Sequence, residues 1–257
     1  MTLLRDDDLS AAFDHAASAY DRLVAASPGY HGHLRRSARR LRLPDGGAGM
    51  RILDLGCGTG ASTAALLAAA PWADIVAVDA SAGMLERAAA KRWPSTVRFV
   101  HAPVEKLADV LTDVGSGQPD AGYDAAFAAY LFRNVSDPEA VLTSVRDLLA
   151  PGGRLAVHEY TLSGRPADRA VWTAVCRSIV MPAGRLTGDA ELYRHLWRSV
   201  VDFDTAPVFA ERVARAGFTG VRTLPLPGWQ TGITHTFTAQ VPMIPSPRAD
   251  ETAEAVA

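Results

Sequence analysis

Cysteine is scarce in this chain, because only Cys57 and Cys176 occur among its 257 residues. Two cysteines without a metal-like spacing predict neither a disulfide framework nor a metal centre, and they are typical of a reducing compartment. No apolar run is long enough to span a bilayer, and residues 1–8 lack a signal-peptide pattern. We therefore expect a cytoplasmic protein whose contact with a membrane is at most peripheral.

The chain also lacks an excess of charge of either sign. Its 26 Lys and Arg side chains nearly balance its 28 Asp and Glu side chains, which gives a net charge of −2. Because both signs are mixed along the chain, no region is suited to a phosphate backbone, and we expect no nucleic-acid partner. The length is sufficient for one large α/β domain with a full core. The expected partner is a small molecule, and a homodimer is left open.

Strands and helices alternate from residue 51 onward. This alternation predicts a mostly parallel sheet with helices on both faces and right-handed crossovers, an α/β fold of Rossmann-like type. After residue 160 three helices are followed by two strands with no helix between them, which predicts a hairpin at the sheet edge with one antiparallel strand. The predicted strands are 51–56, 74–79, 97–101, 123–129, 154–160, 221–226 and 232–241, and the predicted helices are 61–70, 82–92, 104–112, 137–149, 166–181, 188–200 and 206–216.

The most informative segment is a strand that runs directly into a glycine-rich turn. The strand residues Ile52-Leu53-Asp54-Leu55 lead into Gly56-Cys57-Gly58-Thr59-Gly60. Because glycine has no Cβ and tolerates positive φ, a ligand can approach the backbone of such a turn and face the amides of the following helix. The next strand ends in Asp79, whose carboxylate can accept both hydroxyls of a ribose. These residues predict a pocket for a nucleoside cofactor.

Two classes of cofactor compete for this pocket. The spacing Gly56-x-Gly58-x-x-Ala61 satisfies the dinucleotide fingerprint, in which the pyrophosphate must be neutralised at the helix start. Here Asp54 precedes the glycines, and a carboxylate favours a cationic ligand without phosphate. The segment from Asp54 to Gly60 resembles motif I of the class I S-adenosylmethionine-dependent methyltransferases. A tight turn without ligand, or Asp54 as a cap of the loop amides, is the structural alternative.

Further segments are similar to the ubiquinone/menaquinone biosynthesis C-methyltransferases, from about residue 10 to 240. The glycine loop and the Pro-Gly-Gly turn at 151–153 are typical of the whole superfamily. The Arg-Asn-Val segment at 133–135 and the Tyr-Arg-His-Leu segment at 193–196 carry the narrower resemblance. The similar segments are 12–23, 132–137, 149–155, 192–200, 216–218 and 232–235.

The resemblance implies an overall organisation and a set of site residues. We expect N-terminal helices over 1–45 that act as a substrate lid, a seven-stranded methyltransferase domain over 46–241 with a helical substrate insertion at about 164–216, and a disordered tail over 242–257. The implied cofactor is S-adenosyl-L-methionine, held by Asp54, Gly56, Cys57, Gly58, Gly60, Asp79, Ala80, Met84, Pro103, Val104 and Ala129. The implied catalytic residues are Arg133, Asn134, His158, Glu159 and Tyr20, and the implied substrate residues are Tyr193, Trp197 and His235.

C-methylation requires a nucleophilic ring carbon, which a hydroquinone supplies when a neighbouring hydroxyl loses its proton. The resemblance implies that Arg133, with Asn134, stabilises the phenolate or orients a water. Arginine is a poor base because it stays protonated, but its charge lowers the pKa of the hydroxyl. His158 and Glu159 point to opposite faces of their strand, so we expect one of them to face the crevice.

Most of these residues also have a structural interpretation. Arg133 could form an ion pair with the helix that begins near Asp137, and Cys57 is interpreted as a small loop side chain. For Tyr20, Tyr193 and His235, core packing explains the residue equally well.

Two positions depart from the family pattern. Pro103 follows the third strand, where family members carry an acidic residue for the adenine amine. Leu131 stands two residues before Arg133, where the family carries glycine. Because Leu131 adds bulk beside Arg133, a methyl acceptor other than a respiratory quinone remains an alternative.

Three functions are therefore carried forward. The first is C-methylation of a prenylated quinol or a related aromatic or isoprenoid acceptor. The second is O-, N- or C-methylation of a small specialised metabolite. The third is a cofactor-binding protein that no longer transfers methyl. An apolar tunnel under helices 166–200 would favour the first, and a closed pocket with several hydrogen-bonding groups would favour the second.

Overall fold

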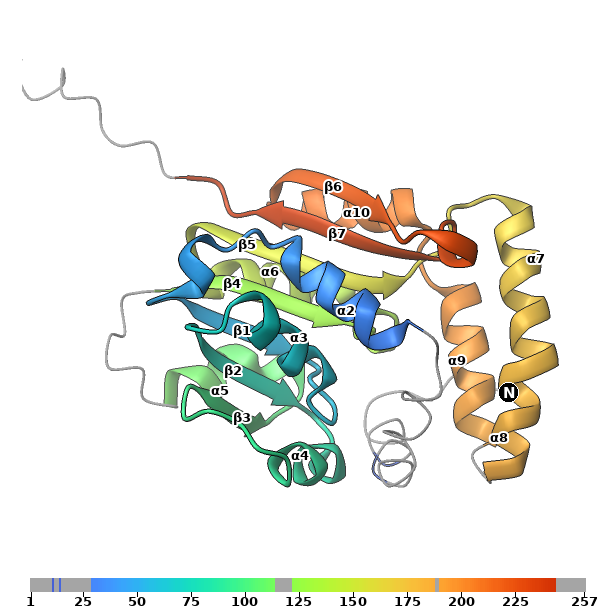
Figure 1. Cartoon of the computed structure of the whole chain (residues 1–257). Helices are drawn as coiled ribbons and strands as arrows, with labels where there is room; N and C mark the ends of the chain where they lie inside the picture. The colour runs from blue at the N-terminus through green and yellow to red at the C-terminus, as the bar shows by residue number, and fades with distance from the viewer. Residues whose placement is uncertain (1–10, 12–13, 15–28, 114–121, 188–189, 244–257) are drawn as a thin grey trace, which may run out of the picture.

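The computed structural model describes residues 11, 14, 29–113, 122–187 and 190–243. Within these residues, seven strands form one sheet in the order β3-β2-β1-β4-β5-β7-β6 (Figure 1). All neighbours are parallel except β7, which runs antiparallel to both β5 and β6. The strands are β1 (Arg51–Leu55), β2 (Asp74–Asp79), β3 (Val97–His101), β4 (Tyr123–Ala129), β5 (Leu149–Tyr160), β6 (Thr219–Pro225) and β7 (Thr234–Gln240).

Helices cover both faces of the sheet. One face packs against α2 (Tyr30–Arg39), α3 (Ala61–Ala69) and α4 (Ala82–Ala89), and the other against α5 (Leu107–Asp113), α6 (Pro138–Leu148) and α10 (Ala206–Arg215). Successive strand residues alternate between the two faces, so each strand contributes to both cores. Leu53 and Leu55 of β1 lie in the α6 core, while Ile52 lies in the α2 core.

The remaining helices stand together beside the carboxyl ends of β4 and β5 (Figure 1). They are α7 (Pro166–Val175), a π-helical turn (Cys176–Val180), α8 (Met181–Thr187) and α9 (Ala190–Asp202). Trp172, Cys176 and Val200 are buried in a separate apolar cluster that joins these helices to Leu162 and Ile233. This arrangement places the helical segment over the edge where open α/β sheets bind ligands.

The expected sheet and its antiparallel hairpin strand are confirmed, and the predicted elements agree to within a few residues at most ends. β5 begins at Leu149 rather than at residue 154, because Leu149 already pairs with Tyr123; the Pro-Gly-Gly turn lies in a register shift before the pairing resumes at Arg154. The helix predicted over 166–181 is interrupted by the π-helical turn at 176–180. α2 ends at Arg39. Three residues later Arg42 has a φ of 51°, a left-handed conformation that cannot continue a right-handed helix.

Several expectations fall on residues outside the described ranges. They are Tyr20, most of the predicted N-terminal helices and most of the predicted tail, from residue 244 onward. The division into domains therefore remains a prediction. None of the helices in the described ranges has the length and apolar composition that crossing a membrane requires.

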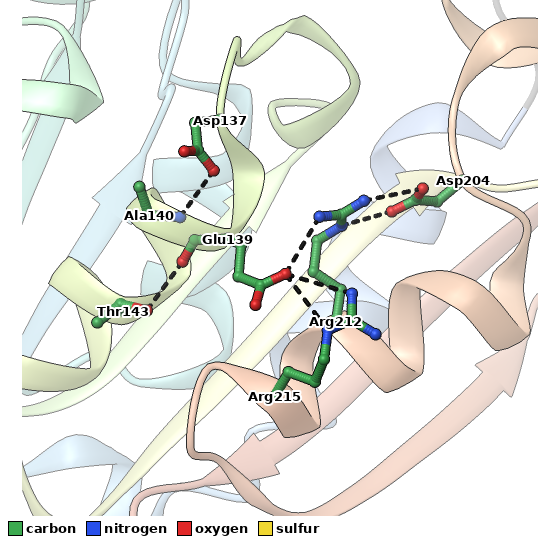
Figure 2. Close-up of polar contacts among 7 residues, drawn as sticks. All are labelled: Asp137, Glu139, Ala140, Thr143, Asp204, Arg212 and Arg215. Atoms are coloured by element: carbon green, nitrogen blue, oxygen red, sulfur yellow. Dashed lines mark hydrogen bonds and ion pairs between the residues drawn. The ribbon is translucent and has the colours of Figure 1, made fainter.

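An ion-pair network joins α10 to α6 on the outside of the molecule (Figure 2). Arg212 forms a two-pronged contact with Asp204, with Nε at 2.6 Å and Nη2 at 3.1 Å from the two carboxylate oxygens. Glu139, near the N-terminus of α6, accepts contacts from Arg212 at 3.4 Å and from Arg215 at 3.2 Å. The network thereby ties the helix that precedes the β6–β7 hairpin to the central half of the sheet.

Arg212→Gln is expected to lower the free energy of unfolding by about 1 kcal/mol at low salt, because networked surface pairs contribute at the upper end of the range for exposed pairs. Urea denaturation measures the loss, which should shrink in 1 M salt because exposed ion pairs are screened. Arg169→Gln is the matched control, since Arg169 is exposed and shows no ion pair in the described part of the chain. Equal losses for the two variants would contradict a stabilising role of the network.

Candidate active site

The glycine-rich turn lies where β1 and β2 end side by side. Gly56, Gly58 and Gly60 have φ values of 67°, 53° and 90°, a region that residues with a Cβ rarely adopt. The backbone N–H groups of Gly56 and Cys57 donate to the Val78 carbonyl at 2.8 and 3.0 Å, which fixes the turn on the end of β2. The sequence expectation of a special backbone at these glycines is therefore met.

A small open pocket lies over this turn. Its wall includes a residue from the end of β4 and one from α2, so the pocket spans the point where the strand order reverses between β1 and β4. Burial raises the pKa of the Cys57 thiol well above its ordinary value, so this side chain stays a neutral part of the wall. The lining residues are Tyr30, Gly56, Cys57, Gly58, Thr59, Ala61, Ser62 and Ala129.

Asp79 bridges the glycine turn and the start of α4. Its Oδ2 accepts from the Gly58 N–H at 2.7 Å, and its Oδ1 accepts from the Ser81 N–H at 2.9 Å. Burial raises the pKa of Asp79, although both backbone hydrogen bonds oppose that rise. The carboxylate is held in place with lone pairs left over, which is the arrangement that recognition of two vicinal hydroxyls requires.

The other residues expected around the adenine lie near Asp79. The Ala80 carbonyl accepts a contact from His101 Nε2 at 3.0 Å, and Met84 is buried in the first turn of α4. The Ala102 N–H donates to the Asp79 carbonyl at 3.0 Å. Pro103 and the buried Val104, which follow Ala102, therefore lie at the same edge of the sheet as Asp79.

One described side chain of the N-terminal segment reaches this region. Asp14 Oδ1 accepts from the Gly83 N–H at 2.9 Å and from the Ser81 hydroxyl. Its carboxylate therefore lies at the N-terminus of α4, where negative charge is favoured. Asp14 therefore contacts Ser81 and Gly83, which follow Asp79 closely along the chain.

Asp54 is fully buried beneath the glycine turn. Its Oδ2 accepts from the hydroxyls of Ser62 and Thr63 at 2.9 and 2.7 Å, whereas its Oδ1 has no hydrogen-bond partner among the described residues. Burial raises the pKa of Asp54 to about 7. The contacts are to hydroxyls of α3 rather than to loop amides, and the unpartnered oxygen fits an approaching cation.

Arg133 and Glu159 form a buried ion pair at the ends of β4 and β5. Arg133 Nη1 lies 2.6 Å from Glu159 Oε1, and the two side chains are 8% and 0% exposed. Glu159 Oε1 also accepts from the Tyr160 N–H at 2.9 Å. Burial raises the pKa of Glu159, while the guanidinium of Arg133 opposes that rise. The predicted ion pair of Arg133 therefore exists, but with Glu159 rather than with the helix near Asp137.

Tyr130 is the site residue that sequence reasoning missed. It follows the last residue of β4 and adopts φ of 59°, which is unusual for a residue other than glycine. Its carbonyl accepts from Arg133 Nη1 at 2.8 Å and from the Asn134 amide at 3.2 Å. Its ring stacks on Tyr160 at 4.7 Å, and Arg133 lies 5.6 Å from both ring centres. Its position directly after the predicted strand 123–129 was the sequence signal that could have identified Tyr130 as a site residue.

His158 and Glu159 do point to opposite faces, and both reach the same cluster. His158 Nε2 lies 3.0 Å from the Tyr130 hydroxyl, while Glu159 holds Arg133. His158 is fully buried, which lowers its pKa to about 3 and keeps the imidazole neutral. Both side chains are buried near Tyr130, and the expectation that one of them faces the crevice remains a prediction.

Two of the residues expected to contact substrate, Tyr193 and Trp197, lie on α9, and the third, His235, lies on β7. Asn134 Oδ1 lies 3.1 Å from His195 Nε2, which links the Arg-Asn segment to α9. Trp197 packs between α7 and α9, Tyr193 lies against Gly184 of α8, and His235 is buried with Nδ1 2.9 Å from the Thr161 carbonyl. Their assignment to substrate remains a prediction.

Leu131 turns toward the glycine loop. A Cβ placed on Gly56 would lie 3.0 Å from Leu131 Cδ1, so the leucine packs on the bare backbone of that glycine. The bulk that replaces the family's glycine therefore lies against the cofactor loop as well as beside Arg133.

Comparison with known proteins identifies the family of this site. The profile of the ubiE/COQ5 methyltransferase family matches residues 1–237. A demethylmenaquinone methyltransferase from Mycobacterium tuberculosis is 32% identical over 227 residues, which cover 86% of this chain and 88% of that protein. The ubiquinone/menaquinone biosynthesis C-methyltransferase UbiE from Syntrophotalea carbinolica is 33% identical over 86% of this chain and 90% of its own.

Solved structures support the fold independently of these sequences. The plantazolicin methyltransferase BpumL in complex with SAH has a TM-score of 0.61 at 13% identity, covering 91% of this chain and 95% of that one. At that identity the likeness concerns the fold, and the family assignment depends on the sequence matches. On those matches, the chain belongs to the ubiE/COQ5 methyltransferase family.

Proposed function

We propose that this protein transfers the methyl group of S-adenosyl-L-methionine to a ring carbon of a reduced, prenylated quinol of the demethylmenaquinol type. The observation that carries the proposal is the buried Arg133–Glu159 pair at the carboxyl ends of β4 and β5, next to the glycine turn. It is supported by membership of the methyltransferase family and by relatives named demethylmenaquinone methyltransferase. An ion pair removed from water suits a reaction that must ionise a hydroxyl and stabilise the anion.

The cofactor half of the site is assigned to the ends of β1, β2 and β3. Bound S-adenosylmethionine would supply an electrophilic methyl group on a sulfonium. In the proposal Asp79 holds the ribose hydroxyls, the glycine turn with Cys57 and Ala129 lies along the amino-acid tail, and Ala80, Met84, Pro103 and Val104 surround the adenine. The buried carboxylate of Asp54 beneath the turn supports a cationic ligand through its charge.

In the acceptor half, Glu159 is proposed to take the proton from a quinol hydroxyl, directly or through one water. Arg133 then stabilises the phenolate, because its guanidinium stays charged whatever the state of Glu159. The ring carbon beside the phenolate would form the new carbon–carbon bond as the methyl–sulfur bond breaks and S-adenosylhomocysteine is left. The ring carbon would then lose its own proton to water, which restores the aromatic ring. Proton transfer to a carboxylate is favoured by the raised pKa of Glu159.

A small, polar acceptor is the second candidate, favoured by the hydrogen-bonding groups around Arg133. Tyr130, Asn134, His158 and His195 all present polar atoms near the ends of β4 and β5. A prenylated acceptor needs an apolar surface for its tail, whereas such groups suit a specialised aromatic metabolite. Peripheral membrane contact belongs to the prenylated case, and both it and a homodimer remain proposals.

Methyl-labelled S-adenosylmethionine and short-chain demethylmenaquinone, reduced and oxidised, distinguish these acceptors by mass spectrometry. We expect label on a ring carbon in the reduced sample only, because only the quinol has a hydroxyl to ionise. Label in neither sample, with cofactor binding measured separately by calorimetry, would overturn the quinol assignment and favour the small acceptor.

Substitutions of Asp79 and Arg133 should impair different steps, cofactor binding and methyl transfer respectively. Asp79→Asn is expected to weaken S-adenosylmethionine binding about 10-fold or more, because a ribose hydroxyl loses a charged acceptor. Arg133→Ala should leave that affinity within about twofold and slow transfer by about 100-fold or more, as for loss of one anion-stabilising group. Binding by calorimetry and single-turnover rates separate the two. Wild-type transfer by Arg133→Ala would show that the arginine has no role in the reaction.

Asp54 should make cofactor binding depend on pH. Its pKa is raised to about 7, so part of the free protein is protonated at neutral pH. A cationic ligand favours the carboxylate, and the affinity for S-adenosylmethionine should therefore rise about 10-fold from pH 6 to pH 8. Calorimetry in buffers of different ionisation enthalpy should detect proton release. In Asp54→Asn this pH dependence should disappear, and its persistence would assign the dependence to another group.

A further inference from the structure

A chain of hydrogen bonds runs from α2 through the sheet to the end of β4. Arg40 Nη1 donates to the Thr236 hydroxyl at 2.8 Å, and that hydroxyl lies 2.7 Å from the Ser37 hydroxyl. Ser37 lies 2.9 Å from His158 Nδ1, and His158 Nε2 lies 3.0 Å from the Tyr130 hydroxyl. His158 and Thr236 are direct partners in the β5–β7 pairing, with Ser37 of α2 beside both. Ser37, Thr236 and His158 are each completely buried.

The protons in this series of hydrogen bonds can be oriented in only one direction. Arg40 has no acceptor, so Thr236 must accept from it and can give its single proton only to Ser37. Ser37 then gives its proton to His158 Nδ1, because Thr236 is already its donor and Nδ1 is the acceptor that its contacts in the described part of the chain leave for that proton. In the reverse direction the Thr236 proton would have no acceptor among the described residues. The hydrogen-bond pattern therefore selects the imidazole tautomer that carries its proton on Nε2.

That tautomer determines what the Tyr130 hydroxyl can do. His158 Nε2–H donates to the Tyr130 oxygen, so the phenolic proton must point away from His158, toward Tyr160 or a bound molecule. Burial, and after it the neighbouring phenol of Tyr160, raise the pKa of Tyr130 well above its ordinary value, so the hydroxyl keeps its proton. The neutral state of His158, whose pKa is lowered to about 3, is required for Nδ1 to accept. Tyr130 is thus prepared as a donor.

The position of Tyr130 gives this donor a place in the reaction. The preceding Ala129 lines the pocket over the glycine turn, and the Tyr130 carbonyl binds Arg133. Its φ of 59° is a strained conformation that the surrounding contacts must hold. The Tyr130 N–H donates to the His158 carbonyl at 2.8 Å, so the same two residues are joined through backbone and side chain.

We propose that Tyr130 is a catalytic residue that donates a hydrogen bond to the oxygen of the methyl acceptor, and that Arg40, Thr236, Ser37 and His158 are positioning residues that orient its hydroxyl. The inference rests on the proposed methyl transfer to an acceptor that ionises at oxygen. Tyr130 stabilises the phenolate by donation without giving up its proton, while Glu159 takes the proton of the acceptor. The site is therefore specific for acceptors that carry a hydroxyl beside the methylated carbon.

The first test uses Tyr130→Phe, which keeps the ring and removes only the hydroxyl. We expect kcat with short-chain demethylmenaquinol to fall by about 10- to 100-fold, with S-adenosylmethionine affinity unchanged, as for loss of a hydrogen bond to a charged group. Tyr123→Phe is the matched control, since Tyr123 is buried at the opposite end of the same strand and should keep wild-type kcat. An unchanged kcat in Tyr130→Phe would overturn the proposal.

A second readout does not require methyl transfer. In the presence of S-adenosylhomocysteine, 1-naphthol serves as a phenol probe whose ionised form has its own absorption. Bound naphthol should ionise about one pH unit higher in Tyr130→Phe than in the wild type or in Tyr123→Phe. That shift, found together with no transfer to demethylmenaquinol, would support the role of Tyr130 and exclude the quinol as acceptor. Equal ionisation in all three proteins would overturn the role of Tyr130.

The positioning residues are tested by nitrogen-15 NMR of the histidine side chains, with His158 assigned by its loss in His158→Leu. The wild type should show the Nε2–H tautomer, and Ser37→Ala should shift His158 toward the Nδ1–H form because its donor is gone. The double variant Tyr130→Phe/His158→Leu should lose no more kcat than Tyr130→Phe alone, since His158 acts through Tyr130. An Nδ1–H tautomer in the wild type, or independent losses in the double variant, would contradict this arrangement.

Discussion

The buried ion pair between Arg133 and Glu159 is the interaction on which the acceptor half of the site depends. Two charges removed from water are tolerated only when each has the other and further hydrogen bonds, because leaving one unpaired costs several kcal/mol. Here Arg133 also binds the Tyr130 carbonyl, and Glu159 accepts from the backbone of Tyr160. The pair therefore fixes the ends of β4 and β5 relative to each other, and with them the tyrosine rings that cover the guanidinium.

The two halves of the site are held by different kinds of structure. The cofactor half consists of backbone groups at strand ends: a glycine turn anchored on Val78 and a carboxylate anchored on Gly58 and Ser81. The acceptor half consists of side chains whose orientation comes from contacts across the sheet, through His158, Ser37 and Thr236. One scaffold can thus keep its cofactor while the acceptor changes, because substitutions in the second half leave the first half intact.

Sequence reasoning succeeded where function follows from local backbone. The glycine turn after β1, the place of Asp79 at the end of β2 and the alternation of strands and helices are each determined within a few neighbouring residues, so their places in the fold were predicted correctly. The roles of the turn and of Asp79 in cofactor binding remain predictions. The partner of Arg133 was not, because Glu159 is 26 positions away and reaches it only through the β4–β5 pairing. Tyr130 and Ser37 were missed for the same reason: Ser37 meets His158 across 121 residues, a contact that no local pattern encodes. The π-helical turn at 176–180 likewise has no sequence signal that periodicity detects.

The most direct test of this account is a double-mutant cycle on the buried pair, with Arg133→Met, Glu159→Gln and the combined variant. Single-turnover methyl transfer and S-adenosylmethionine affinity would be measured for all four proteins. If the pair acts as one unit in the acceptor half, the combined variant should lose no more rate than the worse single variant, with cofactor affinity unchanged. Losses that multiply, or a parallel loss of cofactor affinity, would contradict the central place given to this pair.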